Sequence, residues 1–277
     1  MTESTKFLVL KLYMSNLSKL IPDLINVAKT ASEAILKIYH QDTHLDIQTK
    51  SDRTPLTEAD LTSHTILCEG LQKLTPDYPI LSEESPDISF AKRQMWQRYW
   101  LIDPLDGTQS FINRTGEFCI SVALIENHRA ILGILLAPIS NRCIYGILNE
   151  GAFEIKGEQT LPIKTRSFNQ DNCIMALTRS NSTQQAHFLN NNKPKAVIYC
   201  NSAIKFMHIA TGEADIYPRF GNTSEWDTAA GQCIIEAAGG AVLDWEGKVL
   251  EYNRKDSLLN PPFIAMGDAS VIASVVR

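Results

Sequence analysis

The stretch "RYWLIDPLDGTQSFI" (residues 98–112) decides the fold, because an apolar run ends there in two aspartates, a proline, a glycine and a threonine. Such a run predicts a buried strand, and the residues after it predict a turn. Pro104 favours extended backbone at Asp103, so Asp103 should finish the strand. Gly107 lets a ligand approach the backbone closely, and Thr108 can open a helix whose free N–H groups favour phosphate.

Two interpretations of this turn remain open on the residues alone. Asp103, Asp106 and the Leu105 carbonyl offer the oxygen ligands that hard divalent cations bind. Two carboxylates held together without a cation would repel each other, and one would stay protonated. The alternative is an ordinary Asp-Gly turn beside an unrelated aspartate. The density of oxygen ligands within six residues favours the metal site.

Three further acidic segments carry alternatives of their own. "LSEES" puts Glu83 and Glu84 at the end of a short strand, where a solvated turn and a metal ligand are both reasonable. "EWDTAAGQ" puts Asp227 at the start of a helix rich in small residues, where a helix N-cap is the simpler role. "TPLTEAD" pairs Thr57, an N-cap, with Asp60 at the spacing of a capping box.

Composition narrows the class of protein. The 277 residues are 44% hydrophobic and 21% charged, which is typical of a soluble globular chain. The net charge of -5 argues against nucleic-acid binding through a basic face, and it means that a phosphorylated substrate needs local cations. No apolar run approaches the roughly 20 residues of a membrane span. CxxC and HExxH motifs are absent, so a zinc site is not expected. The six cysteines are typical of free thiols in a reducing cytoplasm.

The order of predicted elements indicates two parts with a break near residues 157–170. The first part should contain helices over 15–40 and 58–74, the strand described above and an antiparallel meander over 118–126, 130–139, 142–149 and 150–155. Pro22 should lie in the first turn of the first helix. Residues 1–14 should be peripheral, with either Met1 or Met14 as the start. The second part alternates strand and helix, which predicts a smaller α/β unit over 172–178, 183–191, 196–200, 202–212, 214–219 and 225–240.

The motifs resemble a known family. "DPLDGT" followed by "GEFCISVALIE", and later "EWDTAAGQ", resemble the lithium-sensitive, magnesium-dependent inositol monophosphatase superfamily. "WQRYW", "YPRFG" and "LNP" resemble its bacterial CysQ-type 3'(2'),5'-bisphosphate nucleotidase branch, and the similarity runs from about residue 17 to about 264. The resemblance implies a layered α/β/α/β sugar-phosphatase sandwich. It would consist of an N-terminal metal-binding α+β subdomain (1–160) and a C-terminal α/β subdomain (161–277).

The resemblance also implies roles for single residues. Two or three Mg²⁺ ions would be bound by Glu83, Asp103, the Leu105 carbonyl, Asp106 and Asp227. Asp60 and Thr108 would orient the nucleophilic water, with Glu83 as a third catalytic residue. Lys50 would stand at the basic position of the mobile loop "TKSDRT". The substrate would contact Glu83, Leu105, Asp106, Gly107, Thr108, Ser202, Lys205 and Asp227.

The nucleotide side departs from the family pattern. Asn181 replaces a histidine, Asn201 a glycine and Ala203 a serine, whereas Ser202 and Lys205 match, and Lys205 suits a second phosphate. The implied reaction is hydrolysis of the 3'-phosphate of 3'-phosphoadenosine 5'-phosphate (PAP) to AMP and phosphate, in sulfur metabolism. The alternatives are an inositol or fructose-1,6-bisphosphatase-like phosphatase and, from another class, a nucleotide-binding regulatory protein without turnover. The implied location is the cytoplasm, and the resemblance allows peripheral association with the cytoplasmic face of the inner membrane.

Overall fold

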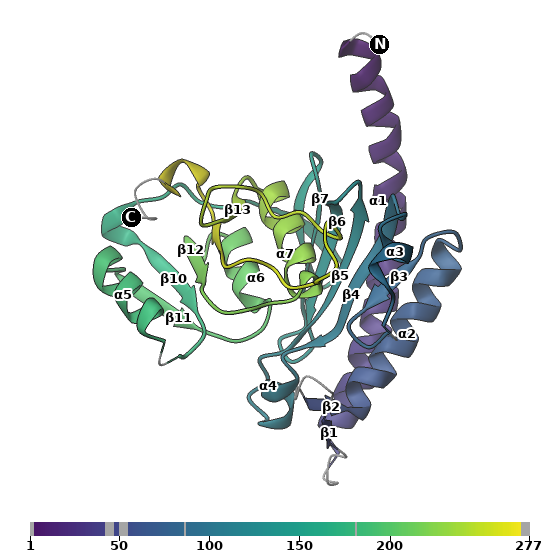
Figure 1. The fold of residues 1–277 in the computed structure, drawn as a ribbon, viewed down its shortest axis with the longest axis horizontal. Coiled ribbons are helices and arrows are strands. Elements are labelled where there is room, and N and C mark those ends of the chain that lie inside the picture. The colour runs from purple at the N-terminus through teal and green to yellow at the C-terminus, as the bar shows by residue number, and fades with distance from the viewer. Residues whose placement is uncertain (1–2, 42–46, 50–54, 86, 181, 273–277) are drawn as a thin grey trace.

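The computed structural model describes residues 3–41, 47–49, 55–85, 87–180 and 182–272. These residues form two large sheets, with helices between and outside them, and a separate two-stranded sheet (Figure 1). Lys50 and Asn181 lie outside the described residues, so the expectations for these two positions remain predictions. None of the helices in the described ranges is long and apolar enough to cross a membrane.

The larger sheet has seven strands in the order β3-β4-β5-β6-β7-β8-β9, and only β3 and β4 pair in parallel. From β4 onward the strands form the antiparallel meander predicted from the sequence, with β9 as an additional member. The strand bounds are β3 Ile80–Ser82, β4 Arg98–Asp106, β5 Cys119–Glu126, β6 Arg129–Ala137, β7 Arg142–Ile147, β8 Gly151–Lys156 and β9 Gln159–Ile163. Separately, β1 (Ile47–Thr49) pairs with β2 (Pro55–Thr57).

The smaller sheet has five strands in the order β11-β10-β12-β14-β13. The parallel pairs β10·β11 and β10·β12 reflect the strand–helix alternation of the sequence. The antiparallel strands β14 and β13 complete the sheet and were not predicted. Their bounds are β10 Ile174–Leu177, β11 Ala196–Tyr199, β12 Ile216–Arg219, β13 Ala241–Asp244 and β14 Phe263–Met266.

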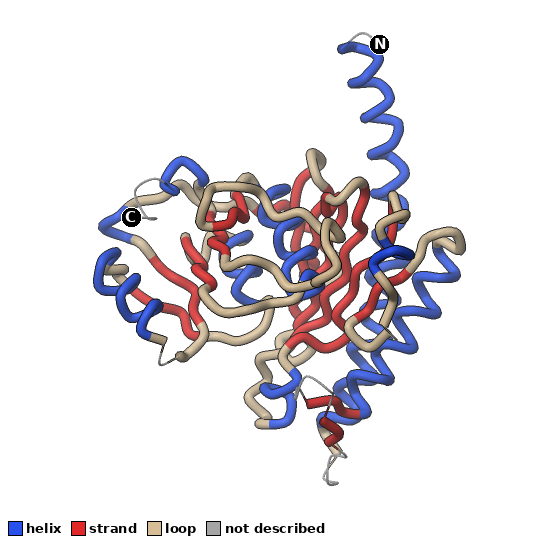
Figure 2. The backbone as a smooth tube through the Cα atoms, in the orientation of Figure 1, coloured by secondary structure: helices blue, strands red, loops and turns tan. Residues whose placement is uncertain are grey.

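Helices form three layers around these sheets (Figures 1 and 2). One pair covers the outer face of the larger sheet, a second pair lies between the sheets, and one helix packs on the far face of the smaller sheet. The layered α/β class is therefore confirmed, with an extra outer helix beyond the four expected layers. The helices are, in chain order, α1 Glu3–Tyr39, α2 Glu58–Leu74, α3 Phe90–Arg93, α4 Thr108–Ile112, α5 Thr183–Asn192, α6 Ile204–Ala210 and α7 Glu225–Ala238.

The small residues of α7 let this central helix approach the larger sheet closely. A Cβ atom on Gly133 of β6 would lie 2.5 Å from the carbonyl oxygen of Ala230, closer than Cβ atoms approach backbone. Ala229 and Ala230 are fully buried against this face. Close approach matters for the site, because the first turn of α7 then lies beside the carboxyl end of β4.

Pro22 does not lie in the first turn of the first helix, so that prediction is wrong. Helix α1 begins at Glu3 and continues through Pro22. The buried residues Leu17, Ile21 and Leu24 form one apolar stripe across the proline. Packing of this stripe offsets the loss of the one backbone hydrogen bond that proline cannot donate.

Candidate active site

A break in strand pairing brings the two aspartates of "DPLDGT" to the same side of β4. Asp103 pairs with Ser121 and Asp106 with Cys119, so three steps along β4 oppose two along β5. In a regular strand, residues three apart point to opposite faces, and the extra residue of this bulge restores a common face. Leu105 fills the bulge with its side chain buried, and its N–H donates to Asp103 Oδ1 over 3.0 Å.

Two other elements bring further acids to this point. Glu83 follows β3, and its N–H donates to the Ile102 carbonyl over 3.1 Å, which places it beside Asp103. Asp227 comes from the first turn of α7. Carboxylate oxygens of Glu83, Asp103 and Asp227 all lie within 4.8 Å of one another. We call these three residues and Asp106 the carboxylate cluster.

The charges of the cluster act on one another strongly. Burial, and then the charges of Glu83, Asp106 and Asp227, raise the pKa of Asp103 well above its ordinary value. Burial and the charge of Asp106 raise the pKa of Asp227 in the same way. Burial raises the pKa of Asp106 to about 6 even though Lys205 acts in the opposite direction. Four oxygen-bearing acids in mutual repulsion fit a hard divalent cation such as Mg²⁺, which would offset their charge.

Asp60 approaches the same turn from the start of α2. Its Oδ2 accepts hydrogen bonds from the Thr57 N–H over 2.8 Å and from the Thr57 hydroxyl over 2.6 Å, which confirms the predicted capping box. Its Oδ1 accepts a hydrogen bond from the Thr108 hydroxyl over 2.9 Å. The expected pair of Asp60 and Thr108 is thus in contact, and Thr108 opens α4 as predicted.

The expectation that Asp227 is a helix N-cap is wrong. Ser224 is the N-cap of α7, and Asp227 stands three positions later, where its Oδ2 accepts from the Ser224 N–H over 2.7 Å. Because Asp227 is the third residue of α7 and not its N-cap, its carboxylate reaches the carboxylate cluster. Asp227 therefore keeps a capping contact and faces the other acids as well.

A cavity of about 210 Å³ opens beside the cluster. Lys205 is buried within it; its Nζ donates to the carbonyls of Ser202 (2.7 Å) and Cys200 (3.3 Å) and lies 5.1 Å from the centre of the Tyr217 ring. Arg219, at the end of β12, lines the same cavity and was missed as a site residue. Arg219 belongs to the "YPRFG" stretch that resembles the nucleotidase branch, and that stretch was the signal that could have found it. Only the sheet topology brings it to this cavity. The lining comprises Asp106, Thr178, Asn201, Ser202, Ala203, Lys205, Phe206, Tyr217, Arg219, Thr223, Asp227, Thr228 and Phe263.

The turn after β4 and the loop before α6 are tied together. Gly107 has a φ of +98°, and a Cβ atom there would lie 2.9 Å from the Glu117 carbonyl oxygen and 3.2 Å from Ser202 Cβ. The Ala203 N–H donates to Asp106 Oδ2 over 2.5 Å. Asn201, one of the departures from the family pattern, donates to Glu117 Oε2 over 2.6 Å. The two halves of the chain therefore meet at this cavity.

Comparison with known proteins decides the family. A model of the inositol monophosphatase family matches residues 16–275. The chain belongs to the inositol monophosphatase family. Membership confirms the family that the two motifs predict, and it places the chain among phosphatases.

Relatives in the inositol monophosphatase family refine the similarity. The chain is 39% identical over 245 residues to the 3'(2'),5'-bisphosphate nucleotidase CysQ of Escherichia coli K12, covering 88% of this chain and 98% of that protein. The crystal structure of CysQ from Bacteroides thetaiotaomicron matches with a TM-score of 0.76 and 32% identity, over 88% of this chain and 95% of that chain. The extragenic suppressor protein suhB of Bartonella henselae, at 22% identity, matches with a TM-score of 0.79 over 94% of this chain and 97% of that chain, which supports the fold alone.

Proposed function

We propose that this chain is a magnesium-dependent phosphatase that removes the 3'-phosphate of PAP to give AMP and phosphate. The observation that carries the proposal is the carboxylate cluster beside a cavity that also contains two cations, Lys205 and Arg219. A molecule with one phosphate at the cluster and another at these cations matches a nucleoside bisphosphate better than a monophosphate. The similarity to proteins named bisphosphate nucleotidases supports the same substrate class.

The carboxylate cluster, with the Leu105 carbonyl, would hold Mg²⁺. Bound Mg²⁺ would supply positive charge that neutralises the phosphoryl oxygens during transfer. The backbone of Gly107 and Thr108 would support the scissile phosphate, since Gly107 takes up a positive φ readily and has no side chain to keep a ligand from the backbone.

Asp60 and Thr108 would prepare the attacking water. The Thr108 hydroxyl donates to Asp60 Oδ1, so it would hold the water by accepting a hydrogen bond from it, and Asp60 Oδ1 would receive the proton of the water. The two bonds from Thr57 fix Asp60 Oδ2, so the oxygen that faces Thr108 keeps its direction. This arrangement supplies a positioned base without any movement of the helix.

Lys205, Arg219 and Ser202 would bind the second phosphate. An ammonium group has three donors, and the two bonds from Lys205 to carbonyl oxygens leave a third for a phosphate oxygen. Arg219 adds a planar guanidinium suited to phosphate. These local cations would resolve the conflict between a net charge of -5 and a polyanionic substrate.

Phosphate release tests the proposal directly. Purified protein with Mg²⁺ should release phosphate faster from PAP than from inositol 1-phosphate. The opposite ranking would favour the inositol alternative, and a lack of Mg²⁺-dependent release from PAP, inositol 1-phosphate and fructose 1,6-bisphosphate would favour a regulatory protein without turnover. A cytoplasmic location is part of this proposal, supported by six free cysteines.

A further inference from the structure

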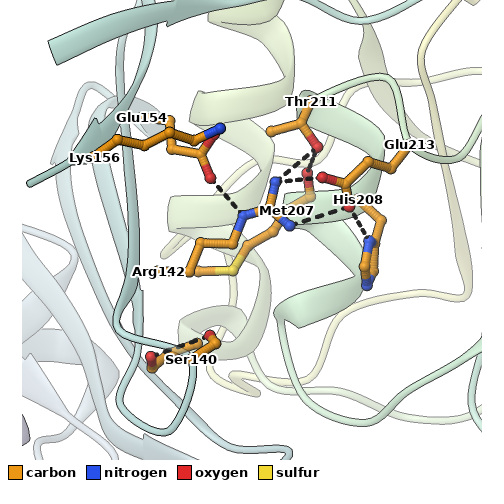
Figure 3. Close-up of polar contacts among 9 residues, drawn as sticks. Ser140, Arg142, Glu154, Lys156, Met207, His208, Thr211 and Glu213 are labelled. Atoms are coloured by element: carbon orange, nitrogen blue, oxygen red, sulfur yellow. Dashed lines mark hydrogen bonds and ion pairs between the residues drawn. The ribbon is translucent and has the colours of Figure 1, made fainter. Parts of the chain in front are cut away.

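A chain of polar contacts joins the larger sheet to the C-terminal end of α6 (Figure 3). Arg142 of β7 donates through Nε to Glu154 of β8 over 2.7 Å. Its Nη1 and Nη2 donate to the two carboxylate oxygens of Glu213, over 3.1 Å and 2.6 Å. Nη2 also donates to the hydroxyl of Thr211 over 3.1 Å. One guanidinium group therefore holds the segment that follows α6 on the sheet, in the paired geometry that arginine makes with carboxylates.

Glu213 is in turn attached to the last turn of α6. Its N–H donates to the carbonyl of His208 over 2.9 Å, and its Oε2 lies 2.5 Å from Nδ1 of the same residue. The hydrogen bond from His208, and then those from Arg142, lower the pKa of Glu213 to about 2 although burial acts in the opposite direction. The carboxylate is therefore charged at neutral pH, and its contact with Arg142 fixes the last turn of the helix.

Lys205 stands at the other end of the same helix. Its Nζ donates to the carbonyls of Ser202 over 2.7 Å and Cys200 over 3.3 Å. Ala203, immediately before α6, donates its N–H to Asp106 Oδ2 over 2.5 Å. The helix is thus held on the larger sheet at both ends, by the end of β4 near Lys205 and by β7 beyond its last turn.

The packing of α6 makes it respond as one rigid body. The helix has seven residues, and Lys205 and His208 are three positions apart, so they occupy neighbouring turns. Phe206, next to Lys205, packs directly on α7, because a Cβ atom on Gly231 would lie 2.3 Å from the Phe206 ring. Close-packed interiors transmit small displacements instead of absorbing them. A shift of the last turn of α6 therefore displaces Lys205 as well.

We propose that Arg142 and Glu213 are positioning residues for Lys205, because their ion pair fixes where the ammonium group meets the second phosphate of the substrate. This inference rests on the proposed function, in which Lys205 binds that phosphate. In the described part of the chain, neither residue of the pair lines the cavity beside the carboxylate cluster. Loss of the pair should therefore weaken binding at the second phosphate and leave the chemical step at the cluster intact.

The alternative is an ion pair that stabilises the fold and does nothing else. The Glu213 side chain is 42% exposed and that of Arg142 is 20% exposed, and exposed ion pairs add little to stability. Glu154 is only 8% exposed, and it keeps Arg142 and Lys156 as partners when Glu213 is removed. Glu213→Ala therefore breaks the link to α6 on its exposed side and leaves the contacts within the sheet in place.

Steady-state kinetics with PAP and Mg²⁺ test the positioning role. Glu213→Ala should raise KM by about five- to tenfold and keep kcat within about twofold of the wild-type value. Arg142→Ala is a second variant with the same expected result, and Arg142→Lys should give an intermediate KM because an ammonium group cannot make the paired bonds.

Lys156→Ala is the matched control for these kinetics. Its Nζ pairs with Glu154 over 3.2 Å in the same group of contacts but on the side away from α6, so KM should stay at the wild-type value. An unchanged KM in both Glu213→Ala and Arg142→Ala, or a loss confined to kcat, would overturn the proposal.

Calorimetric titration with AMP and Mg²⁺ tests whether the effect acts through Lys205. AMP keeps the second phosphate and is the product, not the substrate, of the proposed reaction. Glu213→Ala should weaken AMP binding by about five- to tenfold in the wild-type background and should have no further effect in a Lys205→Met background. Equal losses in the two backgrounds would overturn the proposal, because they would mark the pair as structural. An AMP affinity that does not depend on Lys205, absent binding included, would also overturn it.

The two measurements separate this inference from the proposed function. A protein that does not cleave PAP would refute the proposed reaction, and the AMP titrations would still show whether Glu213 acts through Lys205. Failure of the coupling in the AMP titrations would refute the inference and leave PAP hydrolysis by the wild type intact.

Discussion

Helices α2 and α7 begin in the same way, yet the aspartates in their first turns lie in different electrostatic surroundings. Asp60 and Asp227 both stand three positions after the N-cap, and each accepts a hydrogen bond from the backbone N–H of that residue, Thr57 or Ser224. The other oxygen of Asp60 meets the hydroxyl of Thr108. Asp227 instead is buried among carboxylates, and burial followed by the charge of Asp106 raises its pKa. The cap fixes where a carboxylate lies, and its neighbours decide whether it suits a proton or a cation.

The largest expected effect is the loss of turnover in Asp227→Asn. The asparagine oxygen can still accept the Ser224 N–H, so the helix should remain capped while the cluster loses one charge. Phosphate release should fall by at least about 10⁴-fold, the upper end of the range for loss of a catalytic group. Mg²⁺ affinity, measured by calorimetric titration, should fall with it. Asp23→Asn on the exposed face of α1 is the matched control, and normal turnover in Asp227→Asn would exclude this aspartate as a metal ligand.

Asp60→Asn should separate proton transfer from metal binding. An amide cannot receive the proton of the attacking water, so kcat should fall by about 10²–10⁴-fold. Mg²⁺ affinity and KM for PAP should change little, because both oxygens of Asp60 are held by donors of Thr57 and Thr108, which the asparagine oxygen can still accept in part. If Mg²⁺ affinity fell as far as in Asp227→Asn, the two aspartates would share one role, and the contrast between the two first turns would be lost.

Without metal, Asp227→Asn and Asp60→Asn should change the free energy of unfolding in opposite directions. Asp227 has a raised pKa in the folded protein, so its ionisation destabilises the fold increasingly as the pH rises above the ordinary value of 3.8. In EDTA at pH 8, Asp227→Asn should therefore be more stable than the wild type, by about 1.4 kcal/mol for each pKa unit relieved. The gap should close at pH 3, where both states are protonated.

Asp60→Asn should instead lower the free energy of unfolding by about 1–3 kcal/mol, because buried donors lose their charged acceptor. Urea unfolding in EDTA, with and without added Mg²⁺, measures both variants. Destabilisation by Asp227→Asn in EDTA would show that repulsion within the carboxylate cluster is not a cost to the metal-free fold.

Much of the metal-binding part of the site could be predicted, because the sequence patterns that indicate it are local. The capping box at Thr57, the strand that carries Asp103 and the helix that opens at Thr108 each depend on neighbours within a few residues. The predicted end of that strand at Asp103 is wrong, because β4 continues through the bulge to Asp106. The function of Asp227 was not settled by local residues, since Ser224 and Asp227 are both good N-caps. Only the close packing of α7 on β6, which depends on Gly133, shows which position faces the other acids.

The nucleotide side was less predictable, because it is assembled from distant segments. Arg219 reaches the cavity through the pairing of β12 with β14, and β14 carries no helical or alternating pattern that identifies it. Pro22 misled the prediction for α1, because a local rule on proline was outweighed by an apolar stripe packed on the sheet. The division near residue 160 remains a prediction, since contacts across the cavity join the two parts closely.

The smallest expected effects come from substitutions of the two N-cap residues, Thr57 and Ser224. Thr57→Ala removes a hydroxyl that donates to the buried Asp60 carboxylate over 2.6 Å, so stability should fall by about 2 kcal/mol and kcat by several fold. In Ser224→Ala the backbone N–H that holds Asp227 is kept, so stability should fall by about 1 kcal/mol or less and kcat should stay close to the wild-type value. Thermal unfolding and phosphate release at saturating PAP measure both. Equal losses in the two variants would mean that the Thr57 hydroxyl does not orient Asp60, and that the backbone bond alone positions each aspartate.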